Sequence, residues 1–243
     1  MESMAHAQAR PKSRPARTLA VDIGGTGIKA LVLSATGKPL TERARLKTPR
    51  PATPGAVINA ITEMVKAQGK FDRVSVGFPG VVRRGVTVTA PNLDGQWRNF
   101  KLAEKLSNKL GKPVRIANDA DVQGYGAIEE HGVELVITLG TGFGSALFVD
   151  GKLVPNLEIA HHPYQKGKTY EELLGDAARK KIGKKKWNKR LMKAIQSLDR
   201  LFNYDHLYIG GGNAQKIIIK LPSNAVIVEN VAGLLGGIAL WKD

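Results

Sequence analysis

Cysteine is absent from the 243 residues of this chain, which excludes disulfide bonds and every metal site built on thiolates. Aromatic residues make up only 6%, and no helix-turn-helix, zinc-finger or aromatic-rich RNA-binding motif is visible. Long apolar runs are also missing, because the stretch from Val231 to Trp241 is interrupted by glycines and is too short to span a bilayer. With no signal peptide in sight, these absences predict a soluble, cytoplasmic protein without a membrane partner.

Acidic residues are scarce relative to basic ones. Asp and Glu number 21 against 37 Lys and Arg, which gives a formal net charge of +16. Such an excess predicts an acidic partner, either nucleic acid or a polyanionic substrate, although a basic surface also serves solubility. The imbalance is greatest from Lys166 to Lys193, a segment with the pattern of an amphipathic helix. We interpret it as a surface that binds a polyanion, with a merely solvated helix face as the alternative.

Two glycine-rich turns carry the main functional signal. The first, Asp22-Ile23-Gly24-Gly25-Thr26-Gly27-Ile28-Lys29, joins two apolar runs and predicts a strand, a tight turn and a second strand. Glycines let backbone amides approach an anion such as a phosphate, and an acidic residue can hold a cation beside it. An ordinary hairpin is the alternative for one such turn. The pattern returns at Gly140-Thr141-Gly142, which indicates an internal duplication and a phosphate chain held between two lobes.

Polar residues at strand ends are further candidates. The loop from Pro91 to Trp97 offers groups that suit a sugar, although taken alone it fits a structural loop with a half-buried tryptophan better. Asn118 to Asp121 follow a strand and begin a helix, so their side chains are either helix caps or ligand-binding groups. Because ligands in α/β folds gather at the carboxyl ends of strands, Asp119 is a candidate general base.

Two later segments complete the set of candidates. Glu158, His161 and His162 predict a metal site or a hydroxyl-binding surface, and the lack of cysteine favours hydroxyl binding. Gly210-Gly211-Gly212-Asn213 follows a strand and is expected to open a helix that accepts a phosphate.

In combination, these motifs resemble the ROK family of sugar kinases, and within it the polyphosphate glucokinases. The resemblance extends over nearly everything after residue 18. Each motif alone is weak evidence for the family, but five motifs in the family's order are strong evidence. The matching segments are DIGGTGIK at 22–29, PNLDGQW at 91–97, NDADVQGYG at 118–126, LGTGFGSALF at 139–148 and the pair Glu158 and His161.

The resemblance implies an α/β fold of the actin-like, ribonuclease H-like kind, a duplicated two-lobe sugar kinase fold. The expected parts are a disordered basic tail over 1–17, a small N-terminal lobe over 18–115 and a larger C-terminal lobe over 116–229. A helix over 230–241 would pack back on the first lobe. Dimers are common in the family, so a homodimer is expected, although no interface signal is visible.

The resemblance also implies roles for individual residues. Glucose would be bound by Asn92, Asn118, Asp119, Glu158, His161 and Glu171, with Glu172 as the alternative to Glu171. The phosphoryl donor would lie over Asp22, Gly24, Gly25, Thr26, Lys29, Gly140, Thr141 and Gly142, with Asp22 near Mg²⁺. Asp119 would take the proton from the 6-hydroxyl of the sugar as it attacks the donor.

The chain departs from the family pattern at one place. Many members follow a glutamate-glycine-histidine motif with a cysteine-rich zinc loop, whereas here Ala160 replaces the glycine and no cysteine exists, so no structural zinc is expected. The lysine-rich segment takes the place of that loop, and we assign Lys184, Lys185 and Lys186 as a polyphosphate track. The sequence thus predicts a glucokinase that uses inorganic polyphosphate, with ATP as a further donor. The alternatives are an ATP-dependent hexose kinase and a non-catalytic sugar- or nucleic-acid-binding module.

Overall fold

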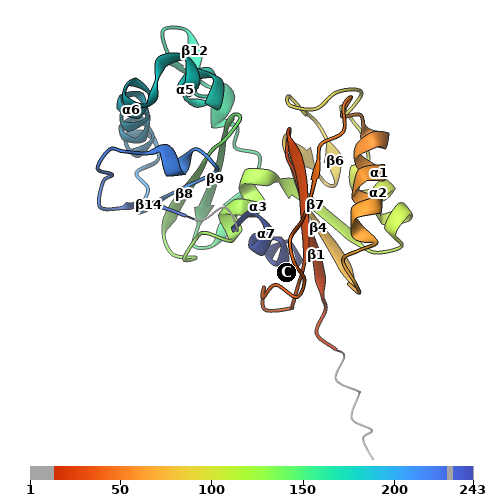
Figure 1. Ribbon diagram of the computed structural model, residues 1–243. Coiled ribbons are helices and arrows are strands. Elements are labelled where there is room, and N and C mark those ends of the chain that lie inside the picture. The colour runs from red at the N-terminus through yellow and green to blue at the C-terminus, as the bar shows by residue number, and fades with distance from the viewer. Residues whose placement is uncertain (1–13, 229–231, 243) are drawn as a thin grey trace, which may run out of the picture.

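The chain forms two lobes, each built on a five-stranded mixed sheet, in a computed structural model that describes residues 14–228 and 232–242. Figure 1 shows helices on the outer side of each sheet and a smaller group of helices between the lobes. Residues 1–13 of the expected basic tail and residues 230 and 231 of the expected closing helix lie outside the described residues. Within the described ranges, no helix is both long and apolar enough to cross a membrane.

The first sheet has the strand order β3-β2-β1-β4-β7, in which β1, β2 and β3 are antiparallel and β4 and β7 run parallel to β1. Apolar residues of the sheet pack with those of α1 and α2, including Ile61 and Leu106, to form the first core. The elements of this lobe are β1 (Thr18–Ile23), β2 (Gly27–Leu33), β3 (Ala44–Lys47), α1 (Pro54–Val65), β4 (Arg73–Phe78), the small hairpin of β5 (Val82–Arg83) and β6 (Val86–Thr87), α2 (Leu102–Leu110) and β7 (Val114–Asn118).

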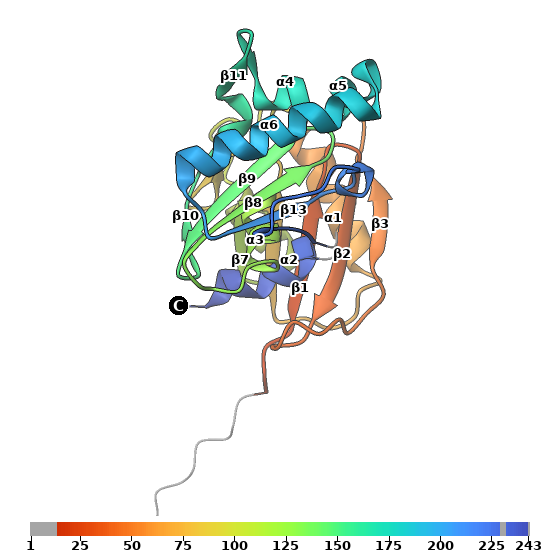
Figure 2. The ribbon, with the colours of Figure 1, turned by 90° about the vertical axis from the view of Figure 1, so that its left-hand side faces the viewer.

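The second sheet has the order β10-β9-β8-β13-β14, with the same alternation of antiparallel and parallel neighbours. Its core is closed by α4 and α6, and Figure 2 shows α6 lying across the strands of this sheet. Trp187 and Leu191 of α6 are fully buried in this core. The elements are β8 (Val133–Leu139), β9 (Phe143–Val149), β10 (Lys152–Val154), a 3₁₀ turn (Ile159–His161), β11 (Pro163–Gln165), β12 (Lys168–Thr169), α4 (Tyr170–Leu174), α5 (Asp176–Ile182), α6 (Lys184–Phe202), β13 (His206–Gly210), a 3₁₀ turn (Ala214–Lys216) and β14 (Ala225–Ile227).

The two sheets are copies of one plan, because each begins with a hairpin around a glycine-rich turn and ends with two parallel strands. The duplication and the two-lobe α/β fold expected from the sequence are therefore confirmed. Helix α3 (Asp119–Tyr125) follows β7 and lies between the sheets. Since β7 belongs to the first sheet and continues to Asn118, we propose to place the lobe boundary after that residue rather than at 115.

The end of the described chain packs on the first sheet. The structure has a short α7 (Ala232–Leu235) and a 3₁₀ segment (Gly236–Trp241) where the sequence predicted one continuous helix. Glycine lowers helix propensity, and a Cβ at Gly236 would collide with the carbonyl oxygen of Val122 on α3. Trp241 Nε1 donates to Ser75 Oγ of β4 at 2.8 Å, which fixes this segment to the first lobe.

The lysine-rich segment also differs from its prediction as a single helix. Lys166 and Gly167 form the turn of the β11–β12 hairpin, with φ angles of 53° and 70°. Three helices follow. Gly175 ends α4 and Gly183 ends α5, whereas α6 ends at Asn203 in the left-handed conformation.

Candidate active site

A cleft of about 600 Å³ lies between the two lobes. Every residue that the sequence assigned to glucose or to the phosphoryl donor borders this cleft. They are Asp22, Gly24, Gly25, Thr26, Lys29, Asn92, Asn118, Asp119, Gly140, Thr141, Gly142, Glu158, His161 and Glu171. Lys184, Lys185 and Lys186 do not border it, and instead occupy the exposed first turn of α6.

The register of the first sheet explains why distant residues meet here. Asp22 is opposite Gly77 on the parallel strand β4, and Gly77 is opposite Ala117 on β7. The carboxyl ends of β1, β4 and β7 therefore coincide, and Asn118 and Asp119 emerge beside the first glycine-rich turn. Gly25 lies close to the loop that carries Asn92, since a Cβ on this glycine would be 3.3 Å from the Asn92 Cβ.

The second sheet brings its own loops to the opposite wall of the cleft. Thr138 of β8 is opposite Gly210 of β13, so the turn at Gly140 and the glycine-rich turn after β13 lie side by side. Asn213 Nδ2 donates to the carbonyl oxygen of Gly140 at 3.0 Å, which ties the two turns together. The turn after β13 does not open an α-helix as expected, but a 3₁₀ turn of three residues.

Asp22, Lys29 and Arg45 form a row of charged residues across β1, β2 and β3. Lys29 is paired in register with both Asp22 and Arg45, so the three side chains share one face of the sheet. Lys29 Nζ donates to Asp22 Oδ2 at 2.9 Å. This row places one carboxylate and two cations at the border of the cleft, next to the first glycine-rich turn.

Asp119 stands at the first position of α3, directly after the cap. Asn118 Oδ1 caps the helix by accepting from the amides of Ala120 and Asp121, while its Nδ2 donates to the carbonyl oxygen of Gly80. Burial, followed by the nearby charge of Asp22, raises the pKa of Asp119 to about 7. The side chain still borders the cleft, so its carboxylate can receive a proton from a bound molecule near neutral pH.

Glu158 and His161 form the other acidic cluster of the cleft. Glu158 Oε2 and His161 Nε2 are 3.8 Å apart, across the 3₁₀ turn that follows β10. Burial raises the pKa of Glu158, an effect that His161 opposes. Asp121 lies behind this pair, 5% exposed, and burial together with Glu158 raises its pKa to about 7. Carboxylates, an amide and an imidazole are the groups that bind the hydroxyls of a sugar.

Glu171, rather than Glu172, faces the cleft. Its Oε2 accepts from the backbone amide of Phe143 at 3.3 Å, and it lies against Gly142 so closely that a Cβ there would overlap the carboxylate. Glu172 is exposed and instead accepts from the amide of Thr169 in the capping box that begins α4. The glycine at 142 is thus needed to make room for an acidic side chain in the cleft.

Trp97 is buried in the first core and cannot stack on a ligand in the cleft. It is 2% exposed, packs against Phe78 and Phe100, and donates from Nε1 to the carbonyl oxygens of Ala52 and Asp94. Trp97 therefore has a structural role in this loop and does not bind the sugar. Asn92 of the same loop does border the cleft. His162 is exposed and does not border the cleft.

Several cleft residues escaped the sequence prediction. Arg43 and Arg45 lie next to the first turn because β3 pairs with β2, a register that is not visible in the sequence. Asp176 begins α5, and Arg179 and Lys180 pair with its carboxylate and lower its pKa to about 2. Gln123 also borders the cleft, and among the described residues only its Nε2 is a buried side-chain polar atom without a partner.

The residues of the cleft fit a magnesium ion better than a transition metal. Among the described residues, no group of three or more His, Cys, Asp or Glu could hold a metal by itself. Mg²⁺ is commonly held by one or two carboxylates, waters and the phosphates of a substrate, and Asp22 supplies such a carboxylate between phosphate-sized turns.

Comparison with known proteins identifies the family of this chain. The model of the ROK family matches residues 18–158, which is more than half of the chain. The chain belongs to the ROK family. Among its ROK relatives, a polyphosphate glucokinase of Mycobacterium tuberculosis (strain ATCC 25177 / H37Ra) is 34% identical over 89% of this chain and 88% of that protein. A polyphosphate glucokinase of Mycobacterium leprae (strain TN) is 33% identical over 90% of this chain and 73% of that protein.

Solved structures of ROK sugar kinases have the same fold as this chain. An inorganic polyphosphate/ATP-glucomannokinase from Arthrobacter sp. strain KM superimposes with a TM-score of 0.85 and 35% identity, over 93% of this chain and all (100%) of that chain. A ROK family glucokinase from Streptomyces griseus, in complex with glucose and AMPPNP, has a TM-score of 0.75 and 23% identity over 92% of this chain and 98% of that chain. The second likeness concerns the fold alone. This ROK protein is accordingly an enzyme of the sugar kinase type.

Proposed function

We propose that the protein is a glucokinase that transfers a phosphoryl group from inorganic polyphosphate, and also from ATP, to the 6-hydroxyl of glucose. The observation that carries the proposal is the joint placement of Asp119, with its pKa raised to about 7, between two glycine-rich turns from opposite lobes. The names of two similar proteins, a polyphosphate glucokinase and an inorganic polyphosphate/ATP-glucomannokinase, support the choice of donor.

Asp119 is the proposed general base. As O6 of glucose attacks the terminal phosphorus, the O6–P bond forms, the bridging P–O bond of the donor breaks, and the hydroxyl proton passes to the Asp119 carboxylate. The leaving group is the polyphosphate chain shortened by one unit, or ADP. A base whose pKa lies near the working pH contributes on the order of 10² to 10⁴ in rate.

The remaining cleft residues position the two substrates. Asn92, Asn118, Glu158, His161 and Glu171 hold the sugar hydroxyls, which orients O6 toward the donor. Lys29 and the backbone amides of the two glycine-rich turns stabilise the charge on the transferred and leaving phosphates. Mg²⁺, when bound near Asp22 with the donor phosphates, supplies further charge neutralisation.

Two arginines beside the first glycine-rich turn support a polyanionic donor. Arg43 and Arg45 border the cleft on the first lobe, and neither forms an ion pair in the described part of the chain. ATP as the main donor is the competing form of this proposal. The homodimer expected from the family stays a prediction, which sedimentation of the full chain would test.

Formation of glucose 6-phosphate is the decisive assay. We expect turnover in the presence of Mg²⁺ with long-chain polyphosphate above that with ATP, and loss of turnover in Asp119→Asn. Mannose should be tested beside glucose, because the similar Arthrobacter protein is a glucomannokinase. Turnover with ATP alone would leave an ATP-dependent hexose kinase, and turnover with neither donor on any hexose would favour a non-catalytic binding module.

A further inference from the structure

We propose that a second, basic pocket near the C-terminal end of α5 binds the part of a polyphosphate chain that extends beyond the reacting phosphate. This inference rests on the proposed polyphosphate-dependent function. The pocket has a volume of about 460 Å³ and lies between the β11–β12 hairpin and helices α4, α5 and α6. Five basic residues border it, Lys166, Lys168, Lys181, Arg190 and Lys193, against one acidic residue, Glu172.

The protein neutralises little of the positive charge of this pocket, since Glu172 is the one acidic residue at its border and interacts with Lys168. Lys166, Lys168, Lys181 and Lys193 form no ion pair in the described part of the chain, although each is close enough to the others to line one cavity. Like charges gathered in one place repel each other, so the arrangement does not serve stability. It is the arrangement expected of a site whose ligand carries several negative charges.

The walls of the pocket are held in place before any ligand binds. Tyr164 of the hairpin stacks on Tyr170 of α4 with ring centroids 4.5 Å apart, and its hydroxyl donates to the carbonyl oxygen of Arg190 at 3.2 Å. Arg190 Nη1 in turn donates to the carbonyl oxygen of Leu173 at 2.9 Å. The hairpin, α4 and α6 are therefore fixed to one another, and little ordering is required on binding.

Two short helices connect this pocket with the catalytic cleft. On α4, Glu171 borders the cleft while its neighbour Glu172 borders the pocket. On α5, Asp176 borders the cleft and Lys181 borders the pocket, a separation of about 7 to 8 Å along the helix at 1.5 Å per residue. The two sites are thus separated by about one and a half turns of α5, a distance that we take an extended chain of phosphates to span.

The chemistry of the pocket favours a phosphate chain over nucleic acid. No aromatic side chain borders it, whereas sites for single-stranded nucleic acid stack bases on aromatic rings. The location also differs from the track that the sequence predicted. Lys184, Lys185 and Lys186 border neither the cleft nor this pocket, and α6 directs its Arg190 and Lys193 there instead.

The test compares three triple variants of the full chain with the same loss of charge. The pocket variant is Lys168→Ala, Lys181→Ala and Lys193→Ala, which spares Lys166 because it lies in the turn of the β11–β12 hairpin. The rival variant is Lys184→Ala, Lys185→Ala and Lys186→Ala. The control variant is Lys70→Ala, Lys105→Ala and Lys109→Ala, exposed lysines of the first lobe. Circular dichroism and thermal melts verify that each variant is folded.

Two readouts are needed. The first is direct binding of long-chain polyphosphate at several salt concentrations. The second is the set of KM values for long-chain polyphosphate, tripolyphosphate, ATP and glucose. We expect the pocket variant to weaken binding of the long chain and raise its KM by about tenfold or more, with a shallower salt dependence. Its KM values for tripolyphosphate, ATP and glucose should be unchanged, as should all values of the control variant.

Three results would overturn the assignment. Equal weakening in the control variant would mean a general effect of net charge, and weakening only in the rival variant would move the site to the first turn of α6. Equally strong competition by an RNA oligonucleotide of matched charge would mean a nucleic-acid site. If the wild-type chain binds long-chain polyphosphate through the pocket but does not turn it over, the proposed function fails while this site stands.

Discussion

Lys29 Nζ lies 2.9 Å from Asp22 Oδ2, and both residues border the cleft from adjacent strands of the first sheet. The pair is partly exposed, with 31% and 22% of the respective side-chain surfaces accessible. Exposed ion pairs contribute little to folding. We therefore propose that this pair chiefly places a cation and a carboxylate where the donor phosphates bind.

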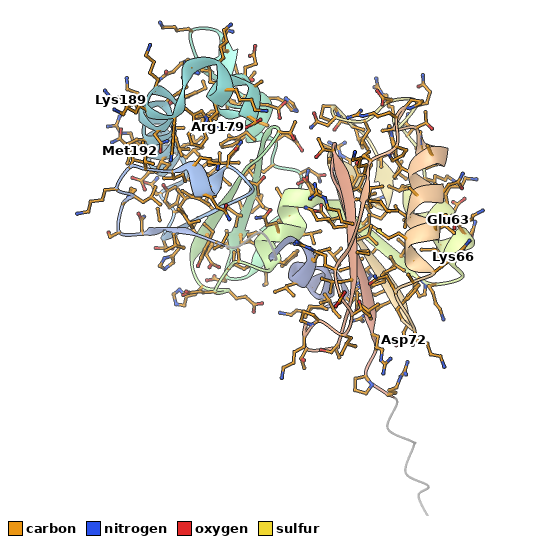
Figure 3. All side chains as sticks on the ribbon, in the orientation of Figure 1. Glu63, Lys66, Asp72, Arg179, Lys189 and Met192 are labelled. Carbon is orange, nitrogen blue, oxygen red and sulfur yellow. The ribbon has the colours of Figure 1, made fainter. Side chains whose placement is uncertain are left out.

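Replacing the cation should therefore affect catalysis more than stability. We expect Lys29→Met to lower kcat with polyphosphate on the order of 10²-fold. The free energy of unfolding should change by less than about 1 kcal/mol. Steady-state kinetics and urea unfolding measure the two effects. Lys66→Met is the matched control, because Lys66 pairs with Glu63 on the outer face of α1, far from the second lobe (Figure 3), and should leave both quantities unchanged.

The pKa of Asp119 predicts the pH dependence of the reaction. Because the base must be ionised, kcat/KM should rise with pH with a midpoint near 7, where burial holds the pKa of this carboxyl. Asp121 contributes to that elevation, so Asp121→Asn should move the midpoint to lower pH while activity persists. A profile with its midpoint near pH 4 in the wild type would remove the assignment of Asp119 as the base.

The same carboxyl predicts a stability effect of opposite sign to its effect on activity. Since its folded pKa is raised above the unfolded value, the folded protein binds more protons between about pH 4 and 7, and this contribution to stability is lost as pH rises through that window. Asp119→Asn should therefore be inactive yet more stable than the wild type at pH 7, by up to about 4 kcal/mol. Chemical unfolding at about pH 4.5 and about pH 7, near the two ends of that window, would show whether the difference grows.

Two glycines of the second turn should separate sugar binding from donor binding. A Cβ at Gly142 would displace the Glu171 carboxylate, so Gly142→Ala should raise the KM for glucose by about tenfold with a smaller effect on the donor. A Cβ at Gly140 meets nothing within 4 Å and projects into open space, so Gly140→Ala should mainly raise the donor KM. Identical kinetic changes in both variants would contradict the assigned roles.

Trp97 should matter for stability and not for sugar binding. Trp97→Ala is expected to cost about 3 to 5 kcal/mol in the free energy of unfolding, because it leaves a cavity in the first core. Trp97→Phe should retain most of the packing and an unchanged KM for glucose. A large rise in this KM for the phenylalanine variant, without loss of stability, would restore the stacking role.

The site was largely predictable because its chemistry is local in sequence. Each glycine-rich turn is one contiguous stretch between apolar strands. Asn118 ends a strand that the hydrophobic pattern reveals, and Asp119 directly follows it. The repetition of Gly-Thr-Gly then identified two lobes. Residues whose place depends on pairing between strands, such as Arg45 opposite Lys29, carry no comparable local signal.

The amino-acid sequence by itself determined the duplicated α/β plan, the two glycine-rich turns and the acidic candidates, since the period of the apolar residues, the turn chemistry and the residue types suffice for these. Only the tertiary structure decided that Trp97 is buried, that Glu171 rather than Glu172 faces the cleft, and that the lysines gather in a pocket away from Lys184 to Lys186. These outcomes depend on which face of a helix, strand or loop packs against residues far away in the sequence. Such burial outweighs the local conformational preference of the segment.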